Sequence, residues 1–592
     1  MAGFSAKTVV LNLFDGVNSL VSWNVAKSSE LSHAENARSE TIGTLEKRAG
    51  TARVGDDISA TANYGLFYFP DSIGQDLYRI SKVGGDTKIY YLANTNFWTD
   101  LAPTLSVTAN LFSTIGAEKC VFLVNGEVNN QQIAADGITV TDSTSTTGHL
   151  YNSPKARKIN YYKGNLYLAD ITPSGVNYPT HVMKSSPLLG IVSLVDGDHD
   201  AGVTSLRVTD TKYIRATDSL DVYRGNVLIE TLTVSAKTET SITVGGTTNP
   251  LLSSDEVWVA GSFAGARQFR WADLPASGIS VKQYDTFSVC GGTNERIKMF
   301  TNIGDVMWIA NNNNIAVWDN YSLKTLDLNI GCVSDKGFVK LAGTMAFIGY
   351  DGIYVTTGGL PKLVSSKIEP LFKAATKNNK EASAAGKKGF SVFFTLGDVA
   401  LTRSDGSAYK TLEDVVVEYN MRQDNCFIHT GIPTDMFDTW LKSTDSDASV
   451  FANTSDFNIY EFLTGESDDT NDADIEIPFR IDSNWIQLCE PEKRVYPYKL
   501  VAVIDRGNAI QSFVALDNED TSDTFYEIRP EEGGLSKGVA VMNFTNRNPL
   551  LKDPPSCWRL KLSIRDTGKK MCKISRLKIL FVDTLEEFEQ LK

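Results

Sequence analysis

Short apolar runs rich in Val, Ile, Tyr, Phe, Trp and Thr recur along the chain, each bounded by Gly, Asn, Asp or Ser. Runs of this composition between tight turns are typical of β-strands. Many come in pairs around a small turn with residues such as Gly164 and Gly352, which tolerate the positive φ of hairpin turns. The pattern therefore predicts a mainly β chain with hairpins at 159–170, 306–319, 346–357 and 451–462.

These hairpins return at intervals of very roughly 40 residues, which is the length of one four-stranded propeller blade. We therefore expect a β-propeller. A set of β-sandwiches built from the same strands is the alternative. Further strands fit the series at 64–70, 88–98, 119–127, 390–398 and 415–421.

Changes in pattern along the chain predict its domains. Short, Thr-rich alternating strands between about 190 and 262 indicate a small inserted domain. The polar acidic stretch 465–474 has the composition of a linker, and strands resume at Ile475. The predicted organisation is an N-terminal arm at 1–60, a propeller in two parts at 61–189 and 263–470, an inserted small β domain at 190–262 and a C-terminal β-sandwich at 471–592.

Helix signals are sparse. From Ser366 to about Thr376, Ile368, Leu371 and Phe372 recur at spacings of three and four, which predicts one short helix beside a mobile loop. The segment from Asp435 to Lys442 follows Pro433 and Thr434, and we expect a single helical turn there.

Charge and composition exclude several classes of protein. The 592 residues carry 57 Lys and Arg against 71 Asp and Glu, and this net charge of −14 has the wrong sign for wrapping duplex DNA. A nucleic acid that passes without sticking is still allowed. We expect no signal peptide and no membrane-spanning segment, and we expect synthesis in a cytoplasm. The seven cysteines form no CxxC pair and are expected to be reduced thiols.

Motifs for chemistry are missing from the sequence. It has no phosphate-cradling GxxxxGK[ST] or GxGxxG loop and no GxSxG elbow, and its histidines form no HxxxH or HExxH pair. We therefore predict that the chain is not an enzyme, and we assign it no catalytic, metal or cofactor-binding residue and no cofactor. The histidines, expected at ordinary surface or core positions, are His33, His149, His181, His199 and His429.

Two acidic clusters are candidates for cation sites. Asp196, Asp198 and Asp200 stand at alternate positions, as calcium ligands often do. An EF-hand loop needs a glycine at its sixth position and a glutamate at its twelfth. Here these positions hold Ala201 and Arg207, which excludes an EF-hand. A weaker cation site and a solvated loop both remain open there. The second cluster is expected to be a linker and contains Asp468, Asp469, Asp472 and Asp474.

Two further features suggest binding. Propellers also host glycosidases, which use paired carboxylates, but the repeated SxDxGxTW boxes of sialidase-type propellers are missing. A basic run could meet DNA or a lipid surface, although its spacing by Ala, Ser and Gly favours a solvated loop. This run consists of Lys373, Lys377, Lys380, Lys387 and Lys388.

Residues 11–51 resemble the N-terminal arm of β-propeller tail proteins of tailed bacteriophages, in which a Gly-Val-Asn segment leads to a Lys-Arg-x-Gly turn. In this chain the motifs begin at Gly16 and Lys47. Residues 331–372 are similar to propeller segments of that family, and 156–170 and 415–431 also look like its blades, with Cys426 where a Trp is expected. The matching positions in 331–372 are Gly331, Asp351, Gly352, Tyr354, Ser366, Ile368 and Glu369.

The resemblance covers most of residues 1–480 and implies a structural virion protein. Such propellers form homo-oligomeric rings, usually hexamers, in the tail nozzle or tail tube. These rings surround the channel through which the double-stranded DNA leaves during genome ejection. The implied partners are copies of this chain and other tail proteins, such as an adaptor or connector and fibres or spikes. The implied location is the phage tail, after synthesis in the host cytoplasm.

Physically, an acidic channel would repel phosphates and let DNA slide. We also expect the N-terminal arm and the C-terminal sandwich to pack against neighbouring subunits, so that deletion of 1–50 would abolish assembly and leave the propeller folded. The alternative function is a receptor-binding or glycan-degrading propeller at the tail tip, with the inserted domain as its binding module. A cellular propeller scaffold is a third reading, for which WD and kelch signatures are lacking.

Overall fold

The computed structural model divides the chain into two compact units. Unit 1 combines Met1–Asp57 with Val333–Lys592, and unit 2 is Ile58–Cys332. The described residues are 7–587 apart from 12–14, 20–26, 28, 41–43, 71–75, 93–96, 102, 108–109, 146–147, 189–190, 262–267, 273–285, 290–294, 327–328, 342, 403–407, 444–445, 466, 471–472, 491, 506–509, 517–525, 537–538, 548–556, 558 and 567–571.

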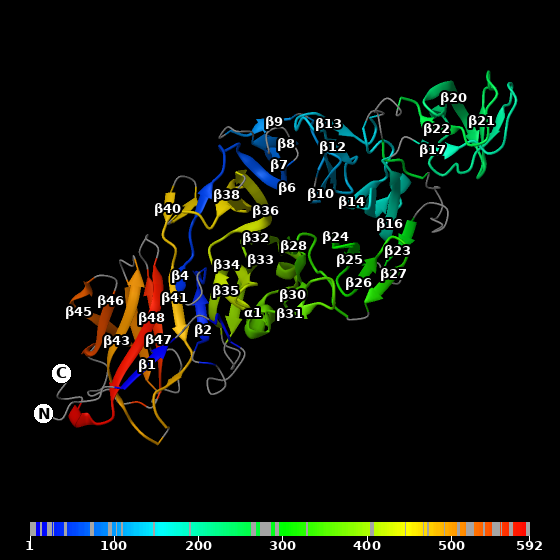
Figure 1. Cartoon of the computed structure of the whole chain (residues 1–592). Coiled ribbons are helices and arrows are strands. Elements are labelled where there is room, and N and C mark those ends of the chain that lie inside the picture. Colours follow the sequence, from blue (N-terminus) through cyan, green and yellow to red (C-terminus); the bar gives the residue numbers. More distant parts are fainter. Residues whose placement is uncertain are drawn as a thin grey trace. The chain divides into compact units, whose positions relative to one another are not determined.

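The chain is mainly β, as predicted (Figure 1). In unit 2, four antiparallel sheets of four strands follow one another along the sequence. The first two are β6 (Ala60–Phe69), β7 (Asp76–Val83), β8 (Asp86–Leu92) and β9 (Thr99–Asp100), then β10 (Ser113–Ala117), β11 (Cys120–Val124), β12 (Gln131–Ile133) and β13 (Val140–Asp142). The third and fourth are β14 (Lys155–Tyr162), β15 (Asn165–Thr172), β16 (Tyr178–Pro187) and β23 (Thr286–Ser288), then β24 (Met299–Ile303), β25 (Val306–Ala310), β26 (Ile315–Trp318) and β27 (Leu323–Leu326).

Successive sheets of unit 2 pack face to face, because side chains alternate along each strand. In β11, Leu123 packs with the core of the first sheet, whereas Phe122 packs with Leu168 of β15 on the other side. In β15, Tyr167 faces away from Leu168 and packs with Ile309 of β25. This arrangement of four-stranded sheets is that of propeller blades.

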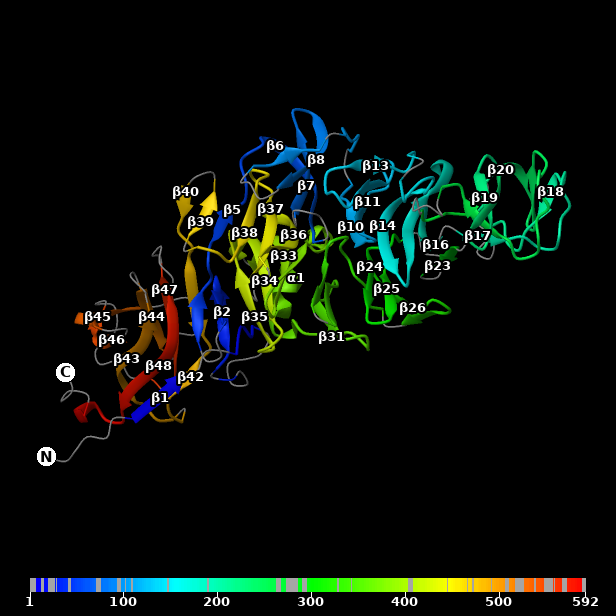
Figure 2. The ribbon, with the colours of Figure 1, turned by 45° about the horizontal axis from the view of Figure 1, so that its top comes forward.

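The predicted insertion interrupts the third blade between β16 and β23. Figure 2 shows its strands grouped together. They share one hydrophobic core, which includes Leu206, Val222 and Val257. The strands are β17 (Ile191–Leu194), β18 (Ser205–Arg207), β19 (Ser219–Arg224), β20 (Val227–Lys237), β21 (Ser241–Val244) and β22 (Glu256–Val259).

Unit 1 contains two smaller sheets. One has β28 (Phe338–Leu341), β29 (Thr344–Ile348), β30 (Ile353–Thr356) and β31 (Lys362–Leu363). The other has β36 (Thr434–Ser443), β37 (Ser446–Asn453), β38 (Ile459–Phe462), β5 (Thr51–Arg53), β39 (Asp468–Thr470) and β40 (Ala473–Ile475).

A third, 16-stranded sheet of unit 1 joins the remaining blade strands to the C-terminal strands. Its order is β3 (Ala37–Arg38), β4 (Leu45–Lys47), β48 (Lys573–Val582), β43 (Tyr496–Asp505), β46 (Val539–Arg547), β45 (Tyr526–Ser536), β44 (Ile510–Leu516), β47 (Arg559–Asp566), β41 (Phe479–Ser483), β2 (Leu31–Glu35), β35 (Asn425–His429), β34 (Ala408–Asn420), β33 (Ser391–Thr402) and β32 (Ala385–Lys388). Two further strands pair off this path: β1 (Lys7–Leu11) with β48, and β42 (Ile486–Gln487) with β47.

The four predicted hairpins are confirmed as β14–β15, β25–β26, β29–β30 and β37–β38. The helix at Ser366 is also confirmed, as a 3-10 turn, η2 (Ser366–Ile368), followed by α1 (Glu369–Ala374). Further helices among the described residues are η1 (Pro173–Gly175) and α2 (Lys377–Ala382). None of the six described cysteines forms a disulfide bond, whereas Cys290 lies outside the described residues.

Three local predictions are wrong. The helical turn expected from Asp435 to Lys442 is strand β36, which pairs with β37 over its length. The basic run is no solvated loop, because its members lie on α1, α2 and β32. The acidic stretch 465–474 contains β39 and β40, and β39 pairs with β5 through Asp468.

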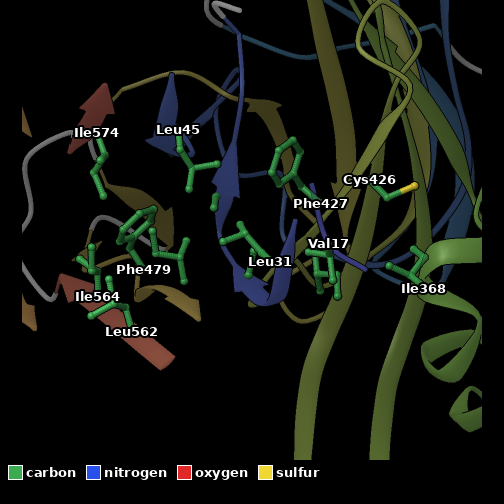
Figure 3. Close-up of a cluster of buried hydrophobic side chains, with 14 of the residues drawn as sticks. Val17, Leu31, Leu45, Ile368, Cys426, Phe427, Phe479, Leu562, Ile564 and Ile574 are labelled. Carbon is green, nitrogen blue, oxygen red and sulfur yellow. The ribbon is translucent and has the colours of Figure 1, made fainter. Parts of the chain in front are cut away.

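The N-terminal arm lies inside unit 1. Strand β2 pairs in parallel with β35 and antiparallel with β41, so it connects the blade strands to the C-terminal strands. Figure 3 shows Leu31 between Phe427 of β35 and Phe479 of β41, with Val17 toward Ile368 and Leu45 toward Ile574.

Several apolar side chains of the arm are buried in the core of their own chain, among them Leu11, Val17, Leu31 and Leu45. One pairing path continues from β32 to β48, so the C-terminal strands are joined to the blade strands through β41 and β2.

Candidate functional site at the N-terminal segment

A group of mostly buried polar side chains lies where the N-terminal segment meets β33, β34, β35 and β39. We call this group the polar junction. Its members come from segments up to 420 residues apart in sequence, and they are joined by hydrogen bonds and ion pairs. The polar junction consists of His33, Glu35, Asn36, Arg38, Arg48, Ser391, Lys410, Glu418, His429, Thr430 and Asp468.

Arg48 makes a buried ion pair with Asp468. Its side chain has no exposed surface, and both terminal nitrogens donate to Asp468, with a distance of 2.8 Å from Nη1 to Oδ1. Nε donates to Asn36 Oδ1 at 2.9 Å, and Nη2 also reaches the carbonyl of Thr430 at 3.3 Å. A two-pronged Arg–carboxylate contact of this kind fixes orientation as well as charge.

Asn36 connects the same arginine to β35. It adopts the left-handed conformation, with φ of 54°, which asparagine tolerates better than most residues. Its Oδ1 accepts from the backbone N–H of Thr430 at 2.9 Å, and its Nδ2 donates to Thr430 Oγ1 at 3.0 Å. The side chain therefore satisfies polar groups of a strand almost 400 residues later.

Two side chains, Lys410 and His33, lie against the carboxylate of Glu35. Lys410 Nζ lies 2.7 Å from Oε2, and His33 Nε2 lies 3.5 Å from the same atom. Burial alone would raise the pKa of Glu35, but hydrogen bonds and positive charge from His33 and Lys410 lower it to about 2.

Glu418 forms the deepest part of the junction. His429 Nε2 lies 2.8 Å from Oε2, Ser391 Oγ donates to Oε1 at 2.5 Å, and Arg38 Nη2 lies 3.4 Å from Oε1. Burial alone would raise the pKa of Glu418, but the charge of Arg38 and the hydrogen bonds from His429 and Ser391 lower it to about 2. Burial also lowers the pKa of His429, against the opposing effect of Glu418.

Ser391, His429 and Glu418 have the residue types of a nucleophilic triad but not its geometry. In a triad, histidine accepts the proton of serine and a carboxylate orients the histidine. Here Ser391 and His429 both bind Glu418, and all three residues are buried. The arrangement therefore satisfies a buried charge and holds strands together.

The other residues of the Lys-Arg-x-Gly motif make further buried contacts next to the polar junction. Lys47 and Asp566 are both fully buried, with 3.7 Å between Nζ and Oδ2, and burial lowers the pKa of Lys47. Gly50 passes so close to β39 that a Cβ atom on it would lie 1.7 Å from the carbonyl oxygen of Ser467. The motif therefore joins the N-terminal segment to β47 and β39.

Gly50→Ala is expected to destabilise unit 1 by about 3 kcal/mol or more, because only backbone movement could relieve a clash with a backbone oxygen. Chemical denaturation would measure this change. Gly84→Ala is the control for adding a methyl group where nothing lies within 4 Å, although its φ of +60° adds local strain in the hairpin between β7 and β8 of unit 2. A variant at Gly50 as stable as the parent would contradict the close approach.

The Gly-Val-Asn motif has a similar structural role. Gly16 has φ of 77°, and a Cβ atom there would lie 2.7 Å from Asn425 Cβ. Val17 is buried, and its N–H donates to the carbonyl of Cys426 at 3.0 Å. Asn18 Nδ2 donates to Glu30 Oε2 at 2.8 Å.

The matched residues in 331–372 also serve folding. Gly352 has φ of 152°, and a Cβ atom there would lie 2.1 Å from Ser365 Oγ. This hydroxyl oxygen accepts a hydrogen bond from the N–H of Ile353 at 2.8 Å. Tyr354 stacks on Phe347, with ring centroids 5.5 Å apart. Ile368 is fully buried in the core of unit 1.

The five histidines do not gather at one site. His33 and His429 belong to the polar junction. His149 lies against Phe122 and Phe269, and His181 lies against Tyr178. His199 Nε2 lies 3.1 Å from the carbonyl of Asp196.

The acidic clusters are also explained by local contacts. Asp196 lies 3.7 Å from Arg207, and Asp198 accepts from the N–H of Ser253 at 2.8 Å. In the second cluster, Asp468 is the partner of Arg48, and Asp472 lies outside the described residues. Over the part of the chain that the structure describes, no three His, Cys, Asp or Glu side chains are grouped as metal ligands.

The polar junction predicts a loss of stability in acid. Glu35 and Glu418 have folded pKa values of about 2, against 4.5 for an unperturbed glutamate, so their contribution is present above pH 4.5 and is lost as the pH falls towards 2. The lowered pKa of His429 acts in the same direction below pH 6.5. For Glu35 the loss is on the order of 3 kcal/mol.

Urea denaturation of the full chain between pH 7 and pH 3, followed by a probe in unit 1, would measure this loss. In Glu35→Gln the fall should be smaller, because that group no longer titrates. An equal fall in the parent and the variant would contradict the role of Glu35.

Sequence reasoning did not identify the polar junction. Glu418 could have been noticed, because it stands in the otherwise apolar strand sequence Val415-Val416-Val417-Glu418-Tyr419. Its partners Arg38 and His429 could not, because nothing local in the sequence indicates which distant strands become neighbours.

Comparison with known proteins adds little. No model of a known protein family matches the chain, and no curated protein matches it significantly. Solved structures similar to it include the computationally designed Ika8 protein, at 8% identity and a TM-score of 0.30, covering 73% of this chain and 96% of that one. A chain of the mitotic checkpoint complex has 10% identity, a TM-score of 0.30 and coverage of 72% and 97%.

YCF48 bound to a D1 peptide has 8% identity, a TM-score of 0.26 and coverage of 74% and 98%. TM-scores this low carry no argument about this chain. The structure itself adds that none of its described helices has the length and apolar character needed to cross a bilayer.

Proposed function

We propose that this chain is a structural protein of a tailed bacteriophage, which forms a homo-oligomeric ring, expected to be a hexamer, in the tail nozzle or tail tube. The ring would surround the DNA exit channel and help to retain and then release the genome. Its partners would be other tail proteins and the passing double-stranded DNA. The chain would have no catalytic role.

One observation carries this proposal. The residues of both N-terminal motifs shared with phage tail propellers make buried contacts that join the N-terminal segment to the blade and C-terminal strands. At Gly16 and Gly50 a neighbouring segment lies so close that only glycine fits. Lys47 and Arg48 each lie against a buried carboxylate, which requires a positive charge. A motif residue that a particular fold requires is better evidence of a relationship between two proteins than a matching residue on a solvated surface.

The site chemistry agrees with a structural role. The buried polar groups of the junction hold strands together. A core shared by the N-terminal, blade and C-terminal strands would resist distortion when DNA is retained under pressure. Contacts with neighbouring subunits would then use surfaces outside this core.

Single-particle cryo-electron microscopy of the purified full-length chain at micromolar concentration would test the proposal. We expect closed rings of about six copies around an open axial channel. Particles that remain monomeric, both alone and when mixed with the neighbouring tail proteins, would contradict it.

A receptor-binding protein is the second candidate. The observation in its favour is the hairpin between β19 and β20 of the inserted domain, where Val227 and Leu228 are 63% and 48% exposed. Exposed apolar side chains at a hairpin tip are suited to binding another molecule. If Val227→Ser/Leu228→Ser abolished adsorption of the labelled protein to host cells and left ring formation intact, this candidate would gain.

A further inference from the structure

Lys47 of β4 and Asp566 of β47 are charged residues whose side chains have no exposed surface. They come from opposite ends of the sequence, and Lys47 Nζ lies 3.7 Å from Asp566 Oδ2. All three residues of β4 are buried, so the lysine lies in protein together with its strand. The fold therefore holds an amine and a carboxyl group together in a place from which water is excluded.

The backbone on both sides of this pair is fixed by neighbouring strands. The N–H of Lys47 donates to the carbonyl of Cys572 at 2.8 Å, next to the pairing of β4 with β48. Asp566, the last residue of β47, lies between its partners Phe479 of β41 and Ile510 of β44. Two groups that a fold holds in contact react as if each were present at very high concentration.

The two groups are costly to bury as an ion pair. A charge-assisted bond from nitrogen to oxygen is usually about 2.7–2.9 Å long, and Arg48 makes one of 2.8 Å with Asp468. At 3.7 Å, the attraction between Lys47 and Asp566 offsets less of the free energy needed to remove both charges from water. Burial lowers the pKa of Lys47, which favours the uncharged amine, and an uncharged lysine amine is a nucleophile.

We propose that Lys47 and Asp566 form an isopeptide bond between Nζ and Cγ. A proton first passes from the ammonium group to Oδ2, which gives an amine and a carboxylic acid. The nitrogen lone pair then forms the bond to Cγ, and the bond from Cγ to the hydroxyl oxygen breaks. That oxygen leaves with its own proton and one from the nitrogen, as one molecule of water. The flexible lysine stem supplies the approach to about 3–3.5 Å that the reacting atoms need.

The bond would replace two buried charges by a neutral amide and would join β4 to β47 covalently. Because residues 47 and 566 enclose most of the chain, it would also restrict the unfolded state, as a disulfide does. The ion pair is the state before this reaction. The inference does not depend on the proposed function, and ring formation tests that function separately.

A neighbouring pair provides a matched control. Lys410 Nζ lies 2.7 Å from Glu35 Oε2, which is closer than the pair at Lys47, but the Lys410 side chain is 37% exposed. Water solvates its ammonium group and so favours the charged form, which does not attack a carboxyl group. We therefore expect Lys410 and Glu35 to remain unlinked.

Mass spectrometry of the intact full-length chain, incubated in its folded state and then denatured and reduced, would test this inference. The chain should be lighter than its sequence requires by one molecule of water. Trypsin should not cleave after Lys47, and a branched peptide should join the segment of Lys47 to that of Asp566. The peptides that carry Glu35 and Lys410 should not be joined to each other. In Lys47→Met the full mass should return.

A parent chain with its full sequence mass would overturn the inference. Water lost elsewhere, such as in a succinimide at Asp351–Gly352, would also overturn it. A third measurement does not depend on a variant that folds: the parent is cut once within unit 2 by limited proteolysis and run on a reducing, denaturing gel. The two pieces should stay together as one band, and their separation would overturn the inference.

Discussion

Deletion of residues 1–50 is expected to unfold unit 1. The deleted segment contributes the buried side chains of Leu11, Val17, Leu31 and Leu45 to the core. At about 1.5–3 kcal/mol for each large apolar side chain, their loss removes on the order of 10 kcal/mol. Because whole domains are stable by about 5–15 kcal/mol, little stability would remain.

The truncated chain should therefore lose the slow amide exchange and protease resistance of unit 1, while the blades of unit 2, which have cores of their own, keep theirs. Limited proteolysis followed by mass spectrometry would distinguish the two units. A peptide of residues 1–57 added in trans is the control, and it should restore protection. A truncated chain in which residues 333–592 stay resistant would contradict this account.

Arg48→Met is expected to cost about 3–5 kcal/mol, because it leaves the carboxylate of Asp468 without its cation. The change also removes the donors to Asn36 Oδ1 and to the carbonyl of Thr430. Chemical denaturation monitored in unit 1 would measure it. Lys373→Met, which breaks an exposed helical pair with Glu369, is the matched control and should cost less than about 0.5 kcal/mol.

The double variant Arg48→Met/Asp468→Leu separates a lost contact from an uncompensated charge. Replacing a buried ion pair by apolar side chains is often nearly neutral, so the double variant should recover most of the stability that Arg48→Met loses. A double variant as unstable as Arg48→Met would show that hydrogen bonds to Asn36 and Thr430 matter more than the buried charge.

Local pattern was sufficient to predict the strands and hairpins. The run around Gly164 has a turn with positive φ at Lys163 and Gly164, and β14 and β15 pair across it as their alternation requires. The short helix after Ser365 was predicted for the same reason, since Ile368, Leu371 and Phe372 form one buried face.

The error at Asp435–Lys442 has a physical reason. Pro433 and Thr434 are typical of a helix start, but the following residues form the outer partner of β37, with Met436 buried and Asp438, Thr439 and Trp440 half-buried. Pairing with a neighbouring strand outweighs the local propensity of a short segment.

The polar junction could not be predicted because its partners are distant in sequence. Arg48 and Asp468 are 420 residues apart, and Arg38 and Glu418 are 380 apart. The acidic stretch 465–474 has the composition of a linker, and only the fold shows that Asp468 is buried against Arg48. The place of the arm in the core has the same reason, because a segment with few apolar residues can still complete a core that distant strands supply.

The N-terminal segment, the blade strands and the C-terminal strands of unit 1 are expected to fold as one body. Native-state hydrogen exchange tests it most directly. We predict that amides of β2, β35 and β47 exchange with the same free energy of opening, equal to that of global unfolding of unit 1. Exchange of β2 at a free energy several kcal/mol lower, while β35 and β47 stay protected, would contradict the claim and identify a detachable arm.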